Sequence, residues 1–266
     1  MKVGFIGAGN MASAMIGGIL NSKLLSPSNI IASAKTDKTL DSIKEKYEIN
    51  TTKDSVSLVK ECDIVVVAVK PYVYEEVLNE IKYHIGNEKI IVTIAAGISI
   101  NSVEKIIGND KKIIRTMPNT PALVNCGMSS LSPNKNIDKN DLDAVKTIFD
   151  SFGKSEIVDE SLIDVVIGAS GSSPAYAFMF IEAMADCAVS YGMKREMAYE
   201  FCAQSLMGAA KMILETKKHP GELKDMVCSP GGTTIEAVKT LENEGMRSAV
   251  IKGMTACIEK SMKMSK

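Results

Sequence analysis

The sequence predicts two parts, a doubly wound parallel α/β domain followed by an all-α domain. In the first half, short β-branched apolar runs alternate with charged amphipathic stretches, a pattern typical of strands and helices built around a parallel sheet. From about Leu162 onward these runs give way to long helical patterns. The chain of 266 residues is long enough for one or two domains. We therefore assign residues 1–160 to the first domain and 161–266 to the second.

Each element of the first domain follows from its residue pattern. The run DIVVVAV over 63–69 is apolar almost throughout, which indicates a strand buried on both faces of a parallel sheet. Right-handed crossovers are expected between such strands. The pattern predicts strands at 3–6, 29–32, 63–69, 90–94 and 112–117, helices at 11–20, 37–47, 71–85 and 101–107, and weaker edge strands at 128–131 and 155–158 around a helix at 139–152.

The second domain contains helices that are apolar on nearly every side. Residues 175–191 are interrupted only by Glu182 and Asp186, and residues 196–215 are similar. A helix that is apolar all round must be buried all round, and the stretch from 161 to 266 is too short to bury both helices. The sequence therefore predicts that a partner subunit covers them.

Composition excludes several classes of function. The 31 basic and 32 acidic residues give a net charge of -1, which lacks the basic footprint of a nucleic-acid binder. Six cysteines without a CxxC pair indicate reduced thiols and neither a disulfide scaffold nor a zinc site. His84 and His219 are the only histidines, so we expect no metal.

The N-terminal run could be mistaken for a targeting segment. Lys2 precedes a largely apolar stretch over 3–20, as in a secretory signal. Five glycines and Asn10 interrupt this stretch, however, and no clear A-x-A cleavage site follows it. No other segment is expected to be long and apolar enough to span a bilayer. We therefore expect a cytoplasmic protein with no membrane partner.

A glycine-rich turn follows the first expected strand and opens the first expected helix. The residues are Gly7, Ala8, Gly9, Asn10, Met11 and Ala12, which form the G-x-G-x-x-A dinucleotide fingerprint. In this motif the first glycine makes the tight turn, the second lets the backbone approach the pyrophosphate, and the small third residue lets helix and strand pack closely. The helix N-terminus favours the anionic pyrophosphate. The first domain is thus expected to be Rossmann-type.

The turn after the second strand distinguishes NADP from NAD. An NAD-binding chain usually places an acid there for the ribose 2′-hydroxyl, whereas this chain has Ser33 at that position and Lys35 close by. Thr36 and Lys38 offer further donors for a 2′-phosphate, and Asp37 is interpreted as the cap of the next helix. NADPH is favoured, with NADH as the alternative. A solvated basic turn without a ligand also fits this pattern.

Two more loops follow strands at the edge where such sheets bind ligands. They are Ala68-Val69-Lys70-Pro71 and Ala95-Ala96-Gly97. Their small residues would allow close approach of the ribose and nicotinamide. Lys70 fits either a site residue or an ordinary exposed charge before a proline-initiated helix.

Packing does not explain three further stretches, at 115–121, 168–176 and 229–235. The last opens a helix that runs to about residue 244. Backbone N–H groups at a helix N-terminus, together with the hydroxyls of Ser229, Thr233 and Thr234, could bind a carboxylate. An N-cap with a flexible lead-in would explain the same residues.

With these motifs together, the chain resembles the pyrroline-5-carboxylate reductase family, whose members carry out the last step of proline synthesis. The resemblance covers essentially the whole length through GFIGAGNMA, AVKP, MPNTPALV, SGSSPAYAF, GAAKM, HPGELKD and SPGGTTIEAV. SPGGTTIEAV is the most specific of these. The resemblance implies a Rossmann domain followed by a helical dimerisation domain, with NADPH and a cyclic imino acid meeting between them. It also implies a homodimer that assembles further, with a decamer as the expected size.

The resemblance also assigns roles to residues. It implies that the 7–12 turn holds the pyrophosphate, that Ser33, Lys35 and Ser55 lie at the adenosine ribose, and that 68–71 with Ala95 and Ala96 line the nicotinamide side. Thr234, nearest the ring nitrogen, and Lys70 are the catalytic candidates. Substrate binding is assigned to Glu160, Ser229, Gly231, Gly232, Thr233 and Thr234. Ser173 departs from the family pattern, in which many relatives have Gly.

The expected chemistry agrees with the residues present. Reducing a cyclic imine requires a positioned hydride and a proton at nitrogen, but no strong base. Alcohol dehydrogenases on similar frameworks need a base, often a lysine on the long helix after the first domain, and residues 171–191 contain no lysine. A reductase or dehydrogenase for another imino or β-hydroxy acid on the same architecture is one alternative function. A dimer that binds NADP without turnover is another.

Overall fold

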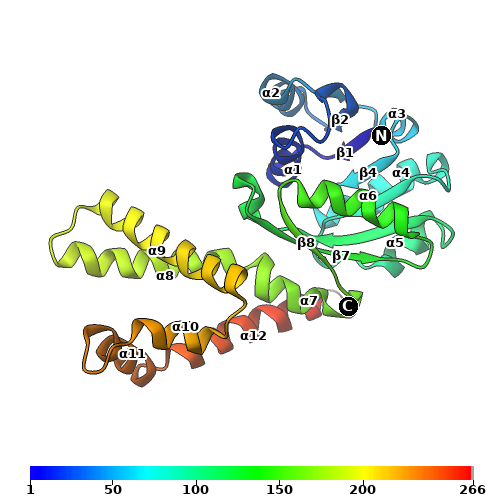
Figure 1. The fold of residues 1–266 in the computed structure, drawn as a ribbon. Coiled ribbons are helices and arrows are strands. Elements are labelled where there is room, and N and C mark those ends of the chain that lie inside the picture. Colours follow the sequence, from blue (N-terminus) through cyan, green and yellow to red (C-terminus); the bar gives the residue numbers. More distant parts are fainter. Residues whose placement is uncertain (265–266) are drawn as a thin grey trace. The chain divides into compact units, whose positions relative to one another are not determined.

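The computed structural model describes residues 1–264, which divide into two compact units (Figure 1). The first comprises residues 1–172 and the end of the chain from residue 257, and the second comprises residues 173–256. The compact units thus divide later than the domain boundary expected at 160/161. Ile163, in the short helix α7 (Ile163–Val166), is 1% exposed, so this segment packs within the first unit. The prediction that two folding domains meet between residues 160 and 161 stays a prediction.

The first unit is built on one eight-stranded sheet with the order β3-β2-β1-β4-β5-β6-β7-β8. All neighbouring strands are parallel except β6 and β7. The doubly wound α/β class is therefore confirmed. The strands are β1 Val3–Ile6, β2 Ile30–Ser33, β3 Asn50–Thr52, β4 Ile64–Val67, β5 Ile90–Thr93, β6 Lys112–Met117, β7 Gly127–Pro133 and β8 Gly153–Ile157.

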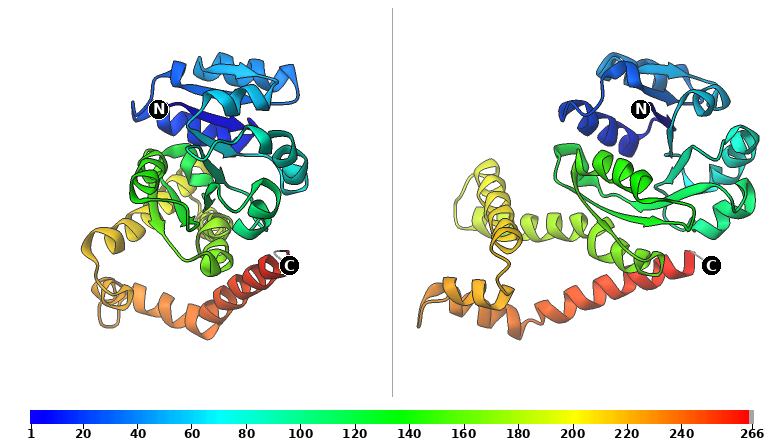
Figure 2. Two further views of the ribbon diagram at one scale, coloured as in Figure 1. Left: turned by 90° about the vertical axis from the view of Figure 1, so that its right-hand side faces the viewer. Right: turned by 45° about the vertical axis from the view of Figure 1, so that its right-hand side comes forward.

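Helices cover both faces of this sheet (Figure 2). Residues alternate along the strands, so that Val66 belongs to one core cluster and Val67 to the other. The first cluster includes residues of α1 (Asn10–Asn21), α2 (Asp37–Tyr47) and α6 (Lys139–Asp150). The second includes residues of α3 (Ser55–Glu61), α4 (Tyr74–Ile81) and α5 (Ile100–Ile107).

Three local features differ from the expected pattern. β7 extends the sheet as expected but runs antiparallel to β6, because only a short 3₁₀ turn, Thr120–Val124, connects them and a parallel pair needs a longer crossover. The helix expected over 71–85 is α4 flanked by the 3₁₀ turns Pro71–Val73 and Lys82–His84. β3 and α3 were not expected, because β3 is short and polar.

The second unit is helical. α8 (Ser173–Ser190) and α9 (Arg195–Thr216) pack around Ala185, Ala198 and Cys202. α10 (Pro220–Val227) and α11 (Thr233–Asn243) follow, and α12 (Met246–Met264) starts in this unit. The all-α second part is confirmed.

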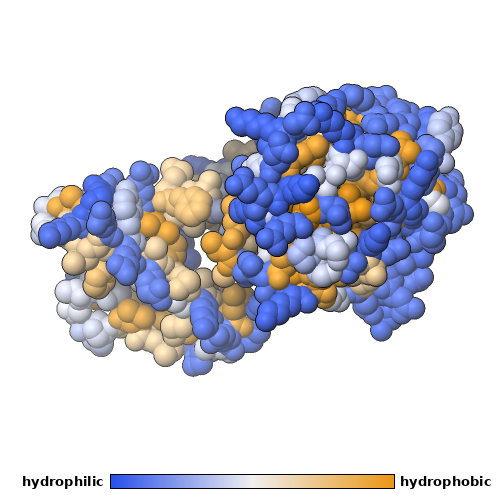
Figure 3. All heavy atoms as spheres, turned by 90° about the horizontal axis from the view of Figure 1, so that it is seen from above, coloured by the Kyte–Doolittle hydropathy of each residue, from blue (hydrophilic) through white to orange (hydrophobic). Residues whose placement is uncertain are grey.

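Within a single chain, the apolar helices of the second unit remain largely exposed. Phe178 and Met179 on α8 are 64% and 69% exposed, and Phe201 on α9 is 63% exposed. Apolar side chains are visible on the surface of these helices in Figure 3. The chain therefore cannot bury this surface alone, in agreement with the expected need for a partner.

One helical stretch, Glu160–Ser190, is long and apolar enough by length and composition to cross a membrane, with a mean hydropathy of 1.2 over its most apolar window. The expectation that the sequence has no such segment was wrong on this criterion. The apolar all-round character of α8 raises the hydropathy, as it would in a helix covered by another protein surface.

Candidate active site

A pocket of about 1090 Å³ opens in the first unit beside the carboxyl ends of β1, β2, β4 and β5. This is the edge at which doubly wound sheets bind their ligands. Thirteen of the fifteen residues predicted to bind the cofactor line this pocket. They are Gly7, Gly9, Asn10, Met11, Ser33, Lys35, Ser55, Ala68, Val69, Lys70, Pro71, Ala95 and Ala96. The sequence thus brings distant segments to one cavity, and their individual roles stay predictions.

The two glycines of the fingerprint turn differ in their surroundings. Gly7 has φ +99°, and a Cβ there would lie 2.6 Å from the carbonyl oxygen of Ala68, so only glycine fits without strain. A Cβ on Gly9 would meet no atom of the described chain within 4 Å. Ala8 and Ala12 do not line the pocket and instead pack against the first core cluster. The turn therefore combines close packing on one side with an open cradle on the other.

The N-terminus of α1 faces this cradle without a protein cap. Gly9 is its N-cap, and among residues 1–264 no side chain hydrogen-bonds to the first turn as a cap. Helix N-termini leave N–H groups unpaired and carry a partial positive charge. The site can thus receive an anion such as a pyrophosphate.

Two serines that line the pocket lie close together at the end of β2. Ser33 is 2% exposed, and its hydroxyl lies 3.4 Å from that of Ser55 at the start of α3. Thr36, and not Asp37 as expected, is the N-cap of α2, since its hydroxyl accepts from the Thr39 amide. Asp37 lies in the first turn and pairs with Lys53 at 2.7 Å. The position at the end of β2, where an NAD-binding chain usually has an acid, is thus held by Ser33.

The other end of the pocket is made by short side chains and by loops after β4, β5 and β6. Ala68, Ala95 and Ala96 leave room there, and Lys70 precedes the 3₁₀ turn that Pro71 begins. Thr120, from the MPNTP stretch, also lines the pocket. This stretch was not among the residues expected to bind the cofactor.

Asn119 connects two of the three stretches that packing does not explain. It is 7% exposed, and its Nδ2 donates to the carbonyl oxygen of Ser170 at 3.1 Å and to the Ser170 hydroxyl at 3.2 Å. Its Oδ1 accepts from the Met128 amide at 2.9 Å. The MPNTP loop is thereby tied to the π-helical turn Ile167–Gly171, a conformation often found at functional sites. No motif in the sequence indicates this link.

Glu160 does not line the pocket. Its Oε1 accepts from Arg115 Nη1 and from the Ile100 amide at the start of α5, both at 2.8 Å. Arg115 is 5% exposed, so Glu160 compensates a buried charge. The structure therefore gives Glu160 a structural task, and substrate binding by this residue stays a prediction.

The remaining predicted substrate residues lie together in the second unit, at the start of α11. Gly231 has φ +67°. Gly232 is the N-cap, and its amide donates to the Ser229 carbonyl oxygen at 3.1 Å. Thr233 and Thr234 are the first two helical residues, and within the described chain no side chain caps this helix. The threonines are thus not the N-cap that the sequence left open, and the amides can meet a carboxylate.

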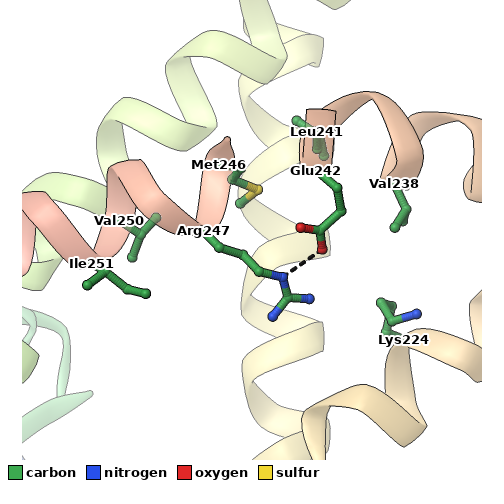
Figure 4. A pocket seen from close by; sticks show the side chains of 8 residues that line it. All are labelled: Lys224, Val238, Leu241, Glu242, Met246, Arg247, Val250 and Ile251. Atoms are coloured by element: carbon green, nitrogen blue, oxygen red, sulfur yellow. Dashed lines mark hydrogen bonds and ion pairs between the residues drawn. The ribbon is translucent and has the colours of Figure 1, made fainter. Parts of the chain in front are cut away.

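A second, smaller pocket of about 490 Å³ lies among α10, α11 and α12 (Figure 4). Val238, Leu241, Met246, Val250 and Ile251 supply its apolar lining. At its edge Arg247 Nε donates to Glu242 Oε1 at 2.6 Å. The pocket is part of the exposed apolar surface of the helical unit. Over residues 1–264 no cluster of three or more His, Cys, Asp or Glu side chains could hold a metal ion.

The fold and the first pocket together define a dinucleotide-binding protein of the Rossmann type. Two family models match the chain, one described as "NADP oxidoreductase coenzyme F420-dependent" over residues 2–97 and one as "Pyrroline-5-carboxylate reductase dimerisation" over residues 160–264. The pyrroline-5-carboxylate reductase of Escherichia coli is 49% identical over 265 residues, covering 100% of this chain and 98% of the relative. The chain belongs to the pyrroline-5-carboxylate reductase family.

Solved structures agree with this assignment. The Plasmodium falciparum pyrroline carboxylate reductase with NADP bound has a TM-score of 0.89 and 33% identity, covering 100% of this chain and 98% of that one. The Coxiella burnetii pyrroline-5-carboxylate reductase has a TM-score of 0.93 and 34% identity with the same coverage. The resemblance stated from the motifs is therefore confirmed.

Proposed function

We propose that this chain reduces 1-pyrroline-5-carboxylate to L-proline with NADPH. The observation that carries the proposal is the match over the full length to relatives named pyrroline-5-carboxylate reductase. Both loops that the reaction requires are intact in this chain, the fingerprint turn at Gly7–Ala12 and the loop at Ser229–Thr234. A protein that only binds the cofactor would need the first loop but not the second.

The first pocket suits NADPH. Its volume of about 1090 Å³ is at the upper end for ligand sites, as an extended dinucleotide requires. The open cradle at Gly9 and the uncapped N-terminus of α1 would hold the pyrophosphate. Ser33, Ser55 and Lys35 would hold the ribose end. Ala68, Ala95 and Ala96 would admit the nicotinamide.

The reaction places few demands on the protein. When bound, the reduced nicotinamide supplies the hydride that C5 of the imine receives. The ring nitrogen takes a proton, so that the C=N double bond becomes a single bond. The amides at the start of α11 hold the substrate carboxylate, and the Thr234 hydroxyl donates to the ring nitrogen, either directly or by orienting water. Lys70 lines the pocket from the loop after β4 and assists by orienting the ring. Most of the rate acceleration comes from positioning.

A substrate panel separates this reaction from its alternatives. We expect NADPH consumption with pyrroline-5-carboxylate and formation of proline. Turnover of a different imino acid or of a β-hydroxy acid, with none of pyrroline-5-carboxylate, would assign the chain to the alternative reductase. Cofactor binding with no turnover of any of them would favour the sensor.

The two fingerprint glycines provide a test of the cofactor site. Gly9→Ala puts a methyl group into the open cradle and is expected to weaken NADPH binding about tenfold or more. Because Gly9 has an ordinary φ of -79°, the free energy of unfolding should change by less than about 0.5 kcal/mol. Fluorescence titration and thermal melts measure the two effects.

Gly7→Ala is the matched variant. Its methyl group would meet the Ala68 carbonyl at a positive φ, so the free energy of unfolding should fall by more than about 1 kcal/mol. If Gly9→Ala binds NADPH as well as the unmodified protein, the pyrophosphate does not lie at this turn.

We also infer a homodimer built by residues 160–264, the range of the dimerisation model, with a decamer as the larger assembly. The exposed apolar surface of α8 and α9 supports the proposal that a second copy of the chain covers these helices. Burial between two copies would also account for the high hydropathy of Glu160–Ser190 without a bilayer.

A cytoplasmic location is also proposed. The six cysteines are free in the described chain, which suits this location.

A further inference from the structure

We propose that Glu76 limits the preference for NADPH over NADH by competing with the 2′-phosphate for Lys35. The inference rests on the proposed function, because it concerns the cofactor of that reaction. Lys35 comes from the turn after β2, whereas Glu76 comes from the first turn of α4. The sequence pointed to Lys35 as a phosphate ligand but did not indicate that an acid would face it.

The two side chains form a direct ion pair at the edge of the pocket. Lys35 Nζ lies 2.9 Å from Glu76 Oε1, and Lys35 itself lines the pocket. The hydrogen bond and charge of Glu76 raise the pKa of Lys35 above its ordinary value. Lys35 is therefore a cation in this state, and it already has a carboxylate partner.

Among the described residues that line this end of the pocket, the other charges do not supply an unpaired cation, and Lys38 does not line the pocket. Lys53 also lines the pocket, but its Nζ lies 2.7 Å from Asp37 Oδ1. Glu80, one turn after Glu76 on α4, lines the pocket as well. The two lysines are thus matched by two carboxylates, and Glu80 adds a negative charge. A 2′-phosphate therefore competes with a carboxylate for the charge of a lysine.

The Lys35–Glu76 pair can be opened at little cost. Its side chains are 73% and 67% exposed, and exposed pairs contribute little to stability. A phosphate that carries up to two charges is a stronger hydrogen-bond acceptor for lysine than one carboxylate. Glu76 therefore does not prevent NADPH binding but reduces its advantage. NADH has no 2′-phosphate and does not need to displace Glu76.

Glu76→Gln tests this competition, because it keeps the shape of the side chain and removes its charge. We expect the Kd of NADPH to fall about two- to fivefold, with the Kd of NADH changed by much less. Binding is measured by fluorescence titration of each cofactor without substrate, at one fixed low salt concentration. Raising the salt should reduce the difference between the variant and the unmodified protein.

Two controls isolate the pair. Glu75→Gln removes the same charge from the neighbouring residue of α4, whereas the ion pair with Lys35 is made by Glu76, so this variant should leave the selectivity unchanged. Lys35→Met should weaken NADPH binding. When Glu76→Gln is added to Lys35→Met, it should no longer lower the Kd of NADPH.

The outcomes separate this inference from the proposed function. If the unmodified protein binds NADPH but Glu76→Gln does not tighten it, the inference is wrong. It is equally wrong if Glu76→Gln tightens NADPH and NADH alike, or if the gain persists without Lys35. Failure of the unmodified protein to bind either cofactor would overturn the proposed function, and this inference with it.

Discussion

Replacing Thr234 by valine is expected to lower kcat about a hundredfold while leaving the Kd of NADPH unchanged. Valine keeps the shape of threonine and removes the hydroxyl. Loss of one preorganised donor at a site of changing charge typically has an effect of this size. Thr234 is the second residue of α11, and the N-cap position is held by Gly232. The hydroxyl is therefore not required as the cap of this helix.

A second threonine on α11 serves as the control. The Thr240 hydroxyl donates to the Glu236 carbonyl oxygen at 3.0 Å, one turn back along the same helix. Thr240→Val should leave kcat within a factor of about two, because surface substitutions usually have small effects. Steady-state kinetics with pyrroline-5-carboxylate compares the two variants. Equal rates in both would mean that Thr234 has no part in the chemistry.

Replacing Met179 by aspartate is expected to convert the assembly into monomers and abolish activity. Met179 is 69% exposed in the single chain, so the charge does not disturb the core of its own unit. In the proposed dimer it would be placed in a large apolar interface, where an unpaired charge is strongly unfavourable. Light scattering coupled to size exclusion measures the mass, and circular dichroism measures the retained helix.

The choice of position decides whether this experiment is informative. Met184 is partly buried against the α8–α9 core, so a charge there would unfold the hairpin as well as any interface. Lys194→Asp introduces the same residue at the exposed N-cap of α9, a favourable position for aspartate, and should leave assembly intact. A stable, active monomer of the unmodified 28.6 kDa chain would contradict the proposed dimer.

Periodicity predicted most of the first unit because its strands are buried on both faces. β1, β4 and β5 are mostly apolar runs, and these strands and β6 each lie within a residue or two of the expected range. β3 gave no such signal, since Asn50, Thr51 and Thr52 form an edge strand through backbone pairing with β2. The direction of β7 depends on the short connection from β6, which periodicity does not report.

The second unit was predicted in character but not in detail. The all-round apolar pattern indicated α8 and α9, and it also indicated that a single chain would leave them exposed. α10 was not among the expected helices. The π-helical turn at Ile167–Gly171 has no sequence signal of its own.

The candidate site was predictable where one local motif specifies it. The fingerprint turn, the loops after β4 and β5 and the start of α11 are each contiguous in the sequence. Partners that meet only through the fold were not predictable. Lys35 and Glu76 are 41 residues apart, Arg115 and Glu160 are 45 apart, and Asn119 and Ser170 are 51 apart. Their side chains are brought together by the order of strands in the sheet.

NADPH that carries deuterium at both C4 positions of the nicotinamide shows whether the cofactor delivers its hydride to this imine. The purified protein is incubated with the labelled cofactor and unlabelled pyrroline-5-carboxylate, and the product is examined by mass spectrometry and NMR. We expect proline that carries one deuterium, located at C5. Proline without deuterium, or consumption of NADPH with the label found in another product, would contradict it.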